Sequence, residues 1–171
     1  MEPAKKTIDE LQDQIVEDFQ SIGDPLSQYE YLLEFAGTLP ELPAEYKVDE
    51  NLVEGCQSRV WLRMGAEGGR LSLAADSDTL IVRGILHLLI NVLGDQPLAD
   101  VAAANIYFLE KADLMMTFND ARRKGIGSTV ATIKRFAAEN VQGTVAGGGW
   151  QAWPHRGREY PLPISPPPSR A

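Results

Sequence analysis

The chain has 171 residues, of which 44% are hydrophobic and 23% charged, and it carries a formal net charge of −8 at pH 7. A chain of this length can bury one sizeable core, so we expect one domain. The acidic balance argues against nucleic acid or an anionic membrane as a partner, and the single cysteine excludes an internal disulfide and any multi-cysteine metal site.

The remaining composition bears on where the protein works. The first seven residues contain no apolar segment after a basic start, so we expect no secretory signal. The longest apolar run, residues 80–93, is interrupted by Arg83, His87 and Asn91 and is too short and too polar to cross a bilayer. We therefore expect a cytoplasmic protein that keeps its thiol reduced and binds no metal or cofactor of its own.

Two helices are predicted at the N-terminus. Thr7 and Glu10 form a capping box, and the apolar residues that follow at spacings of three and four predict a helix that ends near Gly23. Asp24 and Pro25 then begin a second helix, which Gly37 stops. Residues 39–43 contain two prolines and predict an extended linker.

The middle of the chain predicts a hairpin and a buried helix. Residues 59–65 and 71–75 lie on either side of a turn at residues 67–69, and each places every second residue, apolar in each case, on one face, which is typical of two antiparallel strands. These residues are Val60, Leu62 and Met64 in the first strand and Leu71, Leu73 and Ala75 in the second. Residues 48–54 are expected to add a short third strand. A helix over about 79–93 is apolar nearly all round, so it should be largely buried.

The last third predicts short helices, one long helix and a tail. Residues 98–114 indicate short helices, and Asn119 with Asp120 can cap a final helix with a buried stripe of Ile126, Val130, Ile133 and Ala137. Residues 140–171 hold six of the eleven prolines and five of the fifteen glycines. We therefore predict a folded domain over residues 1–139 and a disordered or loosely docked tail over 140–171.

Cys56 is the candidate reactive residue. It follows Gly55, which allows a sharp turn, and it precedes the first strand, so it should lie at a loop-to-strand junction. A cysteine reacts as the thiolate, which nearby cations such as Arg59 or Arg122 would favour. The alternative is that Cys56 is simply a buried core residue.

The residues around this cysteine resemble a known family. The string from Gly55 to Trp61, Gly-Cys-Gln-Ser-Arg-Val-Trp, is similar to the signature of the SufE family, the sulfur-acceptor proteins of iron–sulfur cluster assembly. Residues 76–84, the linker 39–43 and the Arg-x-x-Gly of residues 122–125 resemble further family segments, and the likeness extends over residues 7–139. Asn119-Asp120-Ala121 departs from the Ser/Thr-Pro of many members.

The resemblance implies an α/β (α+β) fold, with a small curled antiparallel sheet of about three strands packed against N- and C-terminal helices. It implies that Cys56 accepts persulfide sulfur from a pyridoxal-phosphate-dependent cysteine desulfurase of the SufS or CsdA type. The chain would stimulate that enzyme and pass the sulfur to an iron–sulfur scaffold of the SufBCD type, without being an enzyme itself. The supporting residues would be Gly55, Gln57, Asp76, Asp78 and Arg122.

Several alternatives stand beside this interpretation. Asp76 and Asp78 are either strand-end and N-cap residues or residues that order the loop facing Cys56. His87 is either a core histidine or the partner of Cys56 in a thiol-dependent hydrolase. The segment from Trp150 to Pro168 is either a plain tail or an interaction module that binds a partner in extended form.

Overall fold

The computed structural model describes residues 5–141, except for the side chain of Thr117. Within that range the chain forms six α-helices, two strands and three short 3₁₀ turns. In chain order these are α1 (Ile8–Ile22), α2 (Pro25–Thr38), η1 (Ala44–Tyr46), η2 (Asp49–Asn51), β1 (Val60–Glu67), β2 (Arg70–Ser77), α3 (Leu80–Leu93), α4 (Leu98–Ala103), α5 (Phe108–Lys111), η3 (Leu114–Thr117) and α6 (Asp120–Asn140).

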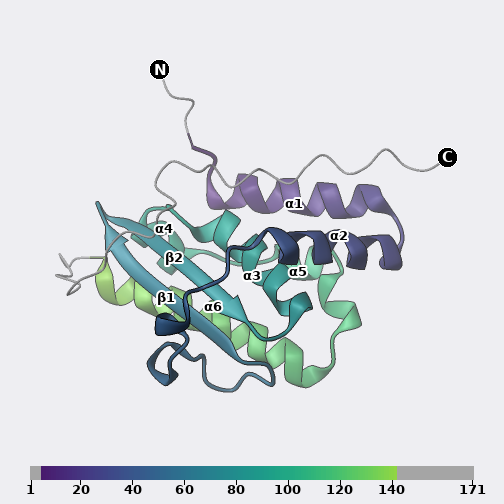
Figure 1. The fold of residues 1–171 in the computed structure, drawn as a ribbon. Helices are drawn as coiled ribbons and strands as arrows, with labels where there is room; N and C mark the ends of the chain where they lie inside the picture. Colours follow the sequence, from purple (N-terminus) through teal and green to yellow (C-terminus); the bar gives the residue numbers. More distant parts are fainter. Residues whose placement is uncertain (1–4, 142–171) are drawn as a thin grey trace.

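The two N-terminal helices begin and end where the sequence predicts. The capping box at Thr7 is present, and α1 is followed by Gly23, whose φ of +81° is the left-handed conformation that glycine tolerates. Asp24 caps α2 through the amide of Ser27, and Pro25 is its first residue. The second helix continues one residue past Gly37 to Thr38. Figure 1 shows both helices on the same side of the molecule.

The sheet is a single hairpin. β1 and β2 pair antiparallel from Val60 opposite Ser77 to Glu67 opposite Arg70, and the turn at Gly68 and Gly69 uses positive φ angles of 58° and 76°. The expected fold of helices and an antiparallel sheet is confirmed.

The predicted third strand over residues 48–54 is wrong. The backbone amides of Asn51 and Leu52 donate to the carbonyls of Val48 and Asp49, so the chain closes on itself as the turn η2. Backbone groups used inside a turn are no longer available to a neighbouring strand. Only an isolated bridge between Leu52 and Trp61 remains.

Helix α3 is the centre of the core. Its residues Leu88, Val92 and Leu93 are completely buried, and it packs against both α2 and β2. Helix α6 packs against β1 and α4, and Figure 1 shows it running beneath the hairpin. The inner face of the hairpin, with Val60 and Leu62, is thereby buried between α3 and α6, which confirms that these residues share a face. Trp61, on the opposite face, is buried as well.

The outer face of the hairpin is covered too. Leu42, from the linker after α2, packs against Trp61 and Ala74 in a second small cluster. Lys47 lies over the ring of Trp61 at 5.7 Å, and Arg63 lies over the ring of Tyr46 at 3.5 Å. The proline-containing linker is therefore an ordered cover for the sheet rather than a loose connection.

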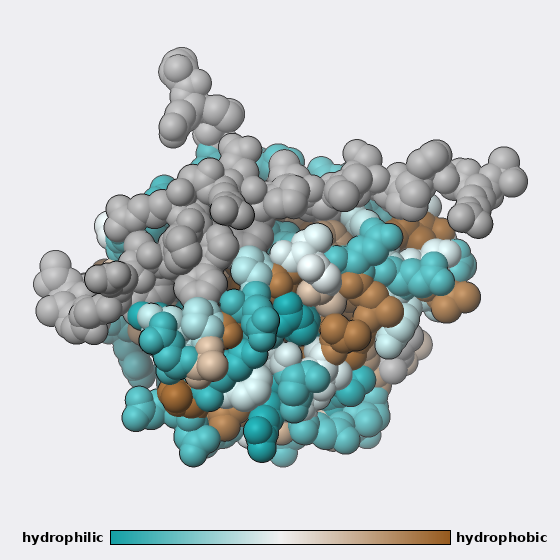
Figure 2. Space-filling view, viewed as in Figure 1, coloured by the Kyte–Doolittle hydropathy of each residue, from teal (hydrophilic) through white to brown (hydrophobic). Residues whose placement is uncertain are grey.

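The face of the described body seen in Figure 2 is mainly hydrophilic, with scattered hydrophobic patches. No helix within residues 5–141 is long and apolar enough to cross a membrane. Helix α6 runs to Asn140, one residue beyond the predicted domain boundary. The predicted tail, with Trp150 and Trp153, lies almost wholly outside the described residues and stays a prediction.

Candidate functional site

Cys56 lies in a short loop just before β1, as the sequence predicts. Gly55 has a φ of +81°, so a residue with a Cβ would be strained there. The amide of Val53 donates to the carbonyl of Val60 at 2.9 Å and closes the base of the loop. The loop is therefore a turn with a closed base, and Cys56 is half-buried inside it.

Helix α6 receives the cysteine side chain. The thiol of Cys56 donates to the carbonyl oxygen of Gly125 at 3.3 Å, and its Sγ lies 3.8 Å from the hydroxyl of Thr129. Gly125 allows this approach because a Cβ there would lie 3.2 Å from the Cα and 3.3 Å from the Sγ of Cys56. The glycine of the Arg-x-x-Gly segment is thus the point at which the cysteine packs against α6.

A small cavity adjoins the sulfur. Its apolar wall comes from α3 and α6, and its polar rim comes from the cysteine loop and the first turn of α6; the lining residues besides Cys56 are Gln57, Ser58, Val60, Val82, Ile85, Leu86, Leu89, Arg122, Gly125, Ile126 and Thr129. The space open to a water-sized sphere is about 20 Å³, and one water molecule needs roughly 10–15 Å³ in this measure. The cavity therefore has room for one more small atom beside Sγ.

The surroundings of the thiol favour its neutral form. Burial raises the pKa of Cys56, and the hydrogen bond from Thr129 lowers it in part. Arg122 is the one charged residue that lines the cavity within the described chain. Its Nε is buried and has no hydrogen-bond partner among residues 5–141, and its guanidinium lies 5.8 Å from the centre of the Phe118 ring.

Arg59, the other predicted cation, does not line the cavity. Its side chain is exposed. Its backbone amide instead binds the carboxylate of Asp78 at 3.1 Å, and its carbonyl accepts from Ser77 Oγ at 2.7 Å. Arg59 therefore contributes backbone contacts to the end of the loop, while Arg122 is the predicted cation that lines the cavity.

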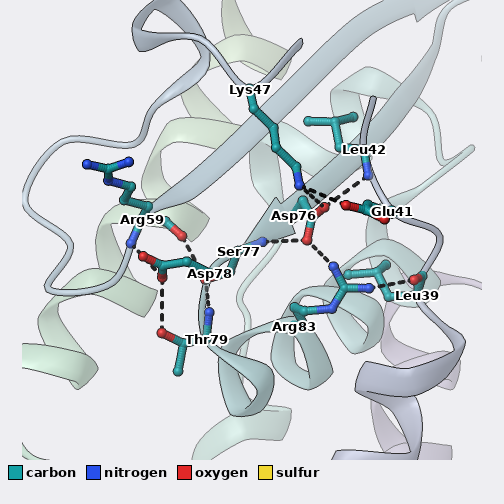
Figure 3. A network of polar contacts seen from close by, with 10 residues as sticks. All are labelled: Leu39, Glu41, Leu42, Lys47, Arg59, Asp76, Ser77, Asp78, Thr79 and Arg83. Carbon is teal, nitrogen blue, oxygen red and sulfur yellow. Dashed lines mark hydrogen bonds and ion pairs between the residues drawn. The ribbon is translucent and has the colours of Figure 1, made fainter. Parts of the chain in front are cut away.

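Asp78 orders the cysteine loop. Its Oδ1 accepts from the amide of Arg59 and lies 3.1 Å from Thr79 Oγ1, which in turn lies 2.8 Å from Ser58 Oγ (Figure 3 shows Asp78, Arg59 and Thr79). The prediction that Asp78 is the N-cap of the buried helix is wrong, because Thr79 occupies that position. The alternative, that Asp78 orders the loop beside Cys56, is the one observed.

Asp76, two residues before Asp78, binds the linker after α2 rather than the cysteine loop. Its carboxylate is completely buried and accepts from the amide of Leu42 at 2.9 Å. It pairs with Arg83 and, at 3.3 Å, with Lys47, and Arg83 also donates to the carbonyl of Leu39 at 2.7 Å (Figure 3). Asp76 thus fixes the linker over the sheet and is not among the residues around Cys56.

The structure does not bring His87 to Cys56. The imidazole is 1% exposed and lies against α2, with Nδ1 2.9 Å from the carbonyl of Phe35 and 3.0 Å from Thr38 Oγ1. Burial lowers its pKa. The neighbouring turns of α3 line the cavity through Val82, Ile85, Leu86 and Leu89 instead. Cys56 and His87 therefore do not form the Cys–His dyad that a thiol hydrolase needs.

The site has two features that sequence reasoning missed. One is Thr129, which belongs to no predicted stripe or motif and is found only because α6 places it one turn after Gly125. The other is the apolar wall of the cavity, which reads in the sequence as ordinary core. Residues 5–141 contain no group of three or more His, Cys, Asp or Glu side chains placed to hold a metal ion.

Comparison with known proteins gives a consistent set of relatives. Residues 13–137 match the model of the SufE family, described as an Fe-S metabolism associated domain. An uncharacterized SufE-like protein of Rhizobium etli is 33% identical over 73% of this chain and 88% of its own. SufE-like protein 1 of Arabidopsis thaliana, chloroplastic/mitochondrial, is 31% identical over 80% of this chain but only 37% of its own length.

A solved structure has the same fold. The solution structure of a hypothetical protein from Thermus thermophilus superposes with a TM-score of 0.65 and covers 78% of this chain and 97% of its own. The two sequences are 20% identical, so this likeness speaks for the fold alone.

Proposed function

The chain belongs to the SufE family, and from this membership and the geometry around Cys56 we propose that it is a non-enzymatic sulfur carrier. Its donor is a pyridoxal-phosphate-dependent cysteine desulfurase of the SufS or CsdA type, which it stimulates by removing the product sulfur. The sulfur then passes to an iron–sulfur scaffold complex of the SufBCD type. We place these steps in the cytoplasm.

The transfer needs one nucleophile and no change of overall oxidation state. The thiolate of Cys56 attacks the terminal sulfur of the persulfide on the donor enzyme. A new S–S bond forms at Cys56 while the S–S bond of the donor breaks, and the donor cysteine leaves as a thiolate. The products are a persulfide on Cys56, which is a reversible modification, and the free thiol of the donor enzyme.

The observation that carries this proposal is the cavity beside Cys56. A persulfide adds one sulfur atom to the side chain, and the space of about 20 Å³ next to Sγ is of that order. The walls from α3 and β1 are apolar, so a sulfur held there has mainly apolar neighbours. A structural cysteine that only fills the core would leave no such space, because cores are close-packed.

The cysteine loop, residues 54–58, can move so that the sulfur of Cys56 leaves the cavity. Its two ends are fixed, one by the bond between Val53 and Val60 and the other by Asp78 on the amide of Arg59. The residues between, 54–58, contain Gly55 and are held to α6 mainly through the cysteine itself. Movement of this short segment would bring Sγ out to a docked partner without unfolding the hairpin.

Arg122 has a role in the same proposal. A persulfide or a thiolate carries negative charge, and burial of an unpaired charge is costly. The unused Nε of Arg122 at the cavity supplies a charged donor for that anion. Gln57 and Gly55 support the site by lining the cavity and by turning the loop.

Two rival functions receive less support. A thiol hydrolase would need His87 near Cys56, and His87 is bound to α2 instead. We therefore expect His87→Ala, where it folds, to accept sulfur as the wild type does. An interaction module built on the tail would lose function when residues 142–171 are deleted, whereas the carrier should retain sulfur acceptance in residues 1–141.

Stimulation of a desulfurase tests the proposal. Alanine release from free cysteine is measured with a SufS-type and, separately, a CsdA-type enzyme, each with the wild-type chain, with Cys56→Ser or alone. We expect the wild-type chain to raise turnover with one of the two enzymes and Cys56→Ser to leave it at the basal rate. Equal stimulation by Cys56→Ser, or none by the wild type with either enzyme, would refute the proposal.

A further inference from the structure

Three atoms form a triangle at the bottom of the cysteine site. The carbonyl oxygen of Gly125 lies 3.3 Å from Cys56 Sγ and 2.9 Å from Thr129 Oγ1, and the third side, from Sγ to Oγ1, is 3.8 Å. The distances place the carbonyl as acceptor of both the thiol and the hydroxyl proton. Thr129 is 2% exposed, so no bulk water competes for its hydroxyl.

The hydrogen bonds of this triangle depend on the proton of the thiol. While Cys56 is a thiol, the S–H group donates to the carbonyl of Gly125, and the hydroxyl of Thr129 donates to the same oxygen. Once the thiol proton has gone to solvent, Sγ becomes an acceptor, and it faces a carbonyl oxygen that is also an acceptor. Besides the Nε of Arg122 at the cavity, the hydroxyl of Thr129 is a donor on α6 that lies 3.8 Å from Sγ, within the reach of a bond to sulfur.

We propose that Thr129 is a positioning residue that rotates its hydroxyl from the carbonyl of Gly125 to Cys56 Sγ when the sulfur becomes an anion. The rotation needs no movement of the backbone, because the hydroxyl proton turns about the bond between Cβ and Oγ1. The thiolate then gains one hydrogen bond inside the cavity, while the Gly125 carbonyl keeps its place in the helix. This inference rests on the proposed function of Cys56 and adds, beside Arg122, a neutral donor that stabilises its anion in an apolar site.

Few other residues that line the cavity could donate a hydrogen bond to the sulfur of Cys56. Arg122 is the one charged group that lines the cavity among the described residues, and the walls from α3 and β1 present only apolar side chains. The cysteine loop adds the neutral Gln57 and Ser58. The bond from Thr129 lowers the pKa of Cys56 against the effect of burial, which agrees with a donor that stabilises the anion.

The test is a titration of Cys56 in the full-length chain. The chain has one cysteine, so protein labelled with ¹³C at the cysteine Cβ gives a single resonance whose shift follows ionisation of the thiol. The variants are Thr129→Val, which removes the hydroxyl, and Thr129→Ser, which keeps it. Thr132→Val is the matched control, because the hydroxyl of Thr132 makes the same kind of bond to Ser128 at 2.7 Å, away from Cys56.

We expect Thr129→Val to lower the ionisation constant of Cys56 about tenfold, equivalent to ~1.4 kcal/mol, as for loss of one bond to a charged acceptor. Thr129→Ser and Thr132→Val should titrate like the wild type. The inference is overturned if Thr129→Val titrates like the wild type, if Thr132→Val shifts equally, or if Thr129→Ser behaves like Thr129→Val. No desulfurase enters this experiment, so its result is independent of whether Cys56 accepts sulfur.

Discussion

The contact between Gly125 and Cys56 is the most direct place to perturb the site. A Cβ on Gly125 would lie 3.2 Å from the Cα, 3.3 Å from the Sγ and 3.4 Å from the Cβ of Cys56. The first two of these distances are tighter than ordinary packing, so Gly125→Ala must shift the cysteine loop slightly away from α6. Gly127 lies two residues on in the same helix and has nothing within 4 Å of its own Cβ position.

Comparing alanine variants of the two glycines isolates the free-energy cost of the clash with Cys56. Replacing a helical glycine by alanine stabilises a helix by about 0.5–1 kcal/mol, so Gly127→Ala should raise the free energy of unfolding by that amount. Gly125→Ala gains the same term but loses about 1–3 kcal/mol to overpacking. The difference between the two variants is therefore the overpacking cost, about 1–3 kcal/mol.

Two measurements check this prediction. Urea unfolding gives the free energy of each variant, and the rate of alkylation by iodoacetamide reports how far Cys56 is exposed. We expect Gly125→Ala to be less stable than Gly127→Ala and to be alkylated faster than the wild type, because its loop is displaced. If Gly125→Ala is as stable as Gly127→Ala and is alkylated at the wild-type rate, then α6 does not hold Cys56 as described.

Two further predictions concern the buried residues Asp76 and His87. Asp76→Ala should cost about 1–3 kcal/mol in urea unfolding, since it leaves the buried amide of Leu42 without its acceptor and removes the carboxylate partner of Arg83, whereas Asp100→Ala at an exposed position should cost less than about 1 kcal/mol; equal costs would refute the role of Asp76. Burial lowers the pKa of His87 below its ordinary 6.5, so the unfolded chain binds a proton there more readily and stability should fall as the pH drops below 6.5. His87→Leu should flatten that part of the pH dependence, and an unchanged slope would contradict a buried neutral imidazole.

Local signals in the sequence predict most of the elements. Thr7, Asp24 and Asn119 each cap a helix through a residue three positions later, so the whole interaction lies within one turn of chain. The hairpin and the position of Cys56 before it likewise depend on neighbours in sequence. Such interactions are visible to periodicity and capping rules because both partners lie in the same short window.

Contacts between distant segments cannot be predicted in this way. Cys56 meets α6 through partners 69 and 73 residues later, and Asp76 binds the amide of Leu42, 34 residues earlier. The pattern of residues 48–54 predicts a strand, yet turn bonds from Asn51 and Leu52 close them as η2. Which donor satisfies a buried carboxylate or thiol depends on the packing of whole elements, and one sequence without its fold does not contain that geometry.

The measurement that tests the central claim most directly is the intact mass of the full-length chain after incubation with a cysteine desulfurase and free cysteine. The account predicts a gain of one sulfur atom that a reductant removes and that Cys56→Ser does not show. A wild-type chain that gains no sulfur while the desulfurase turns over, or a Cys56→Ser chain that gains it equally, would contradict Cys56 as the acceptor.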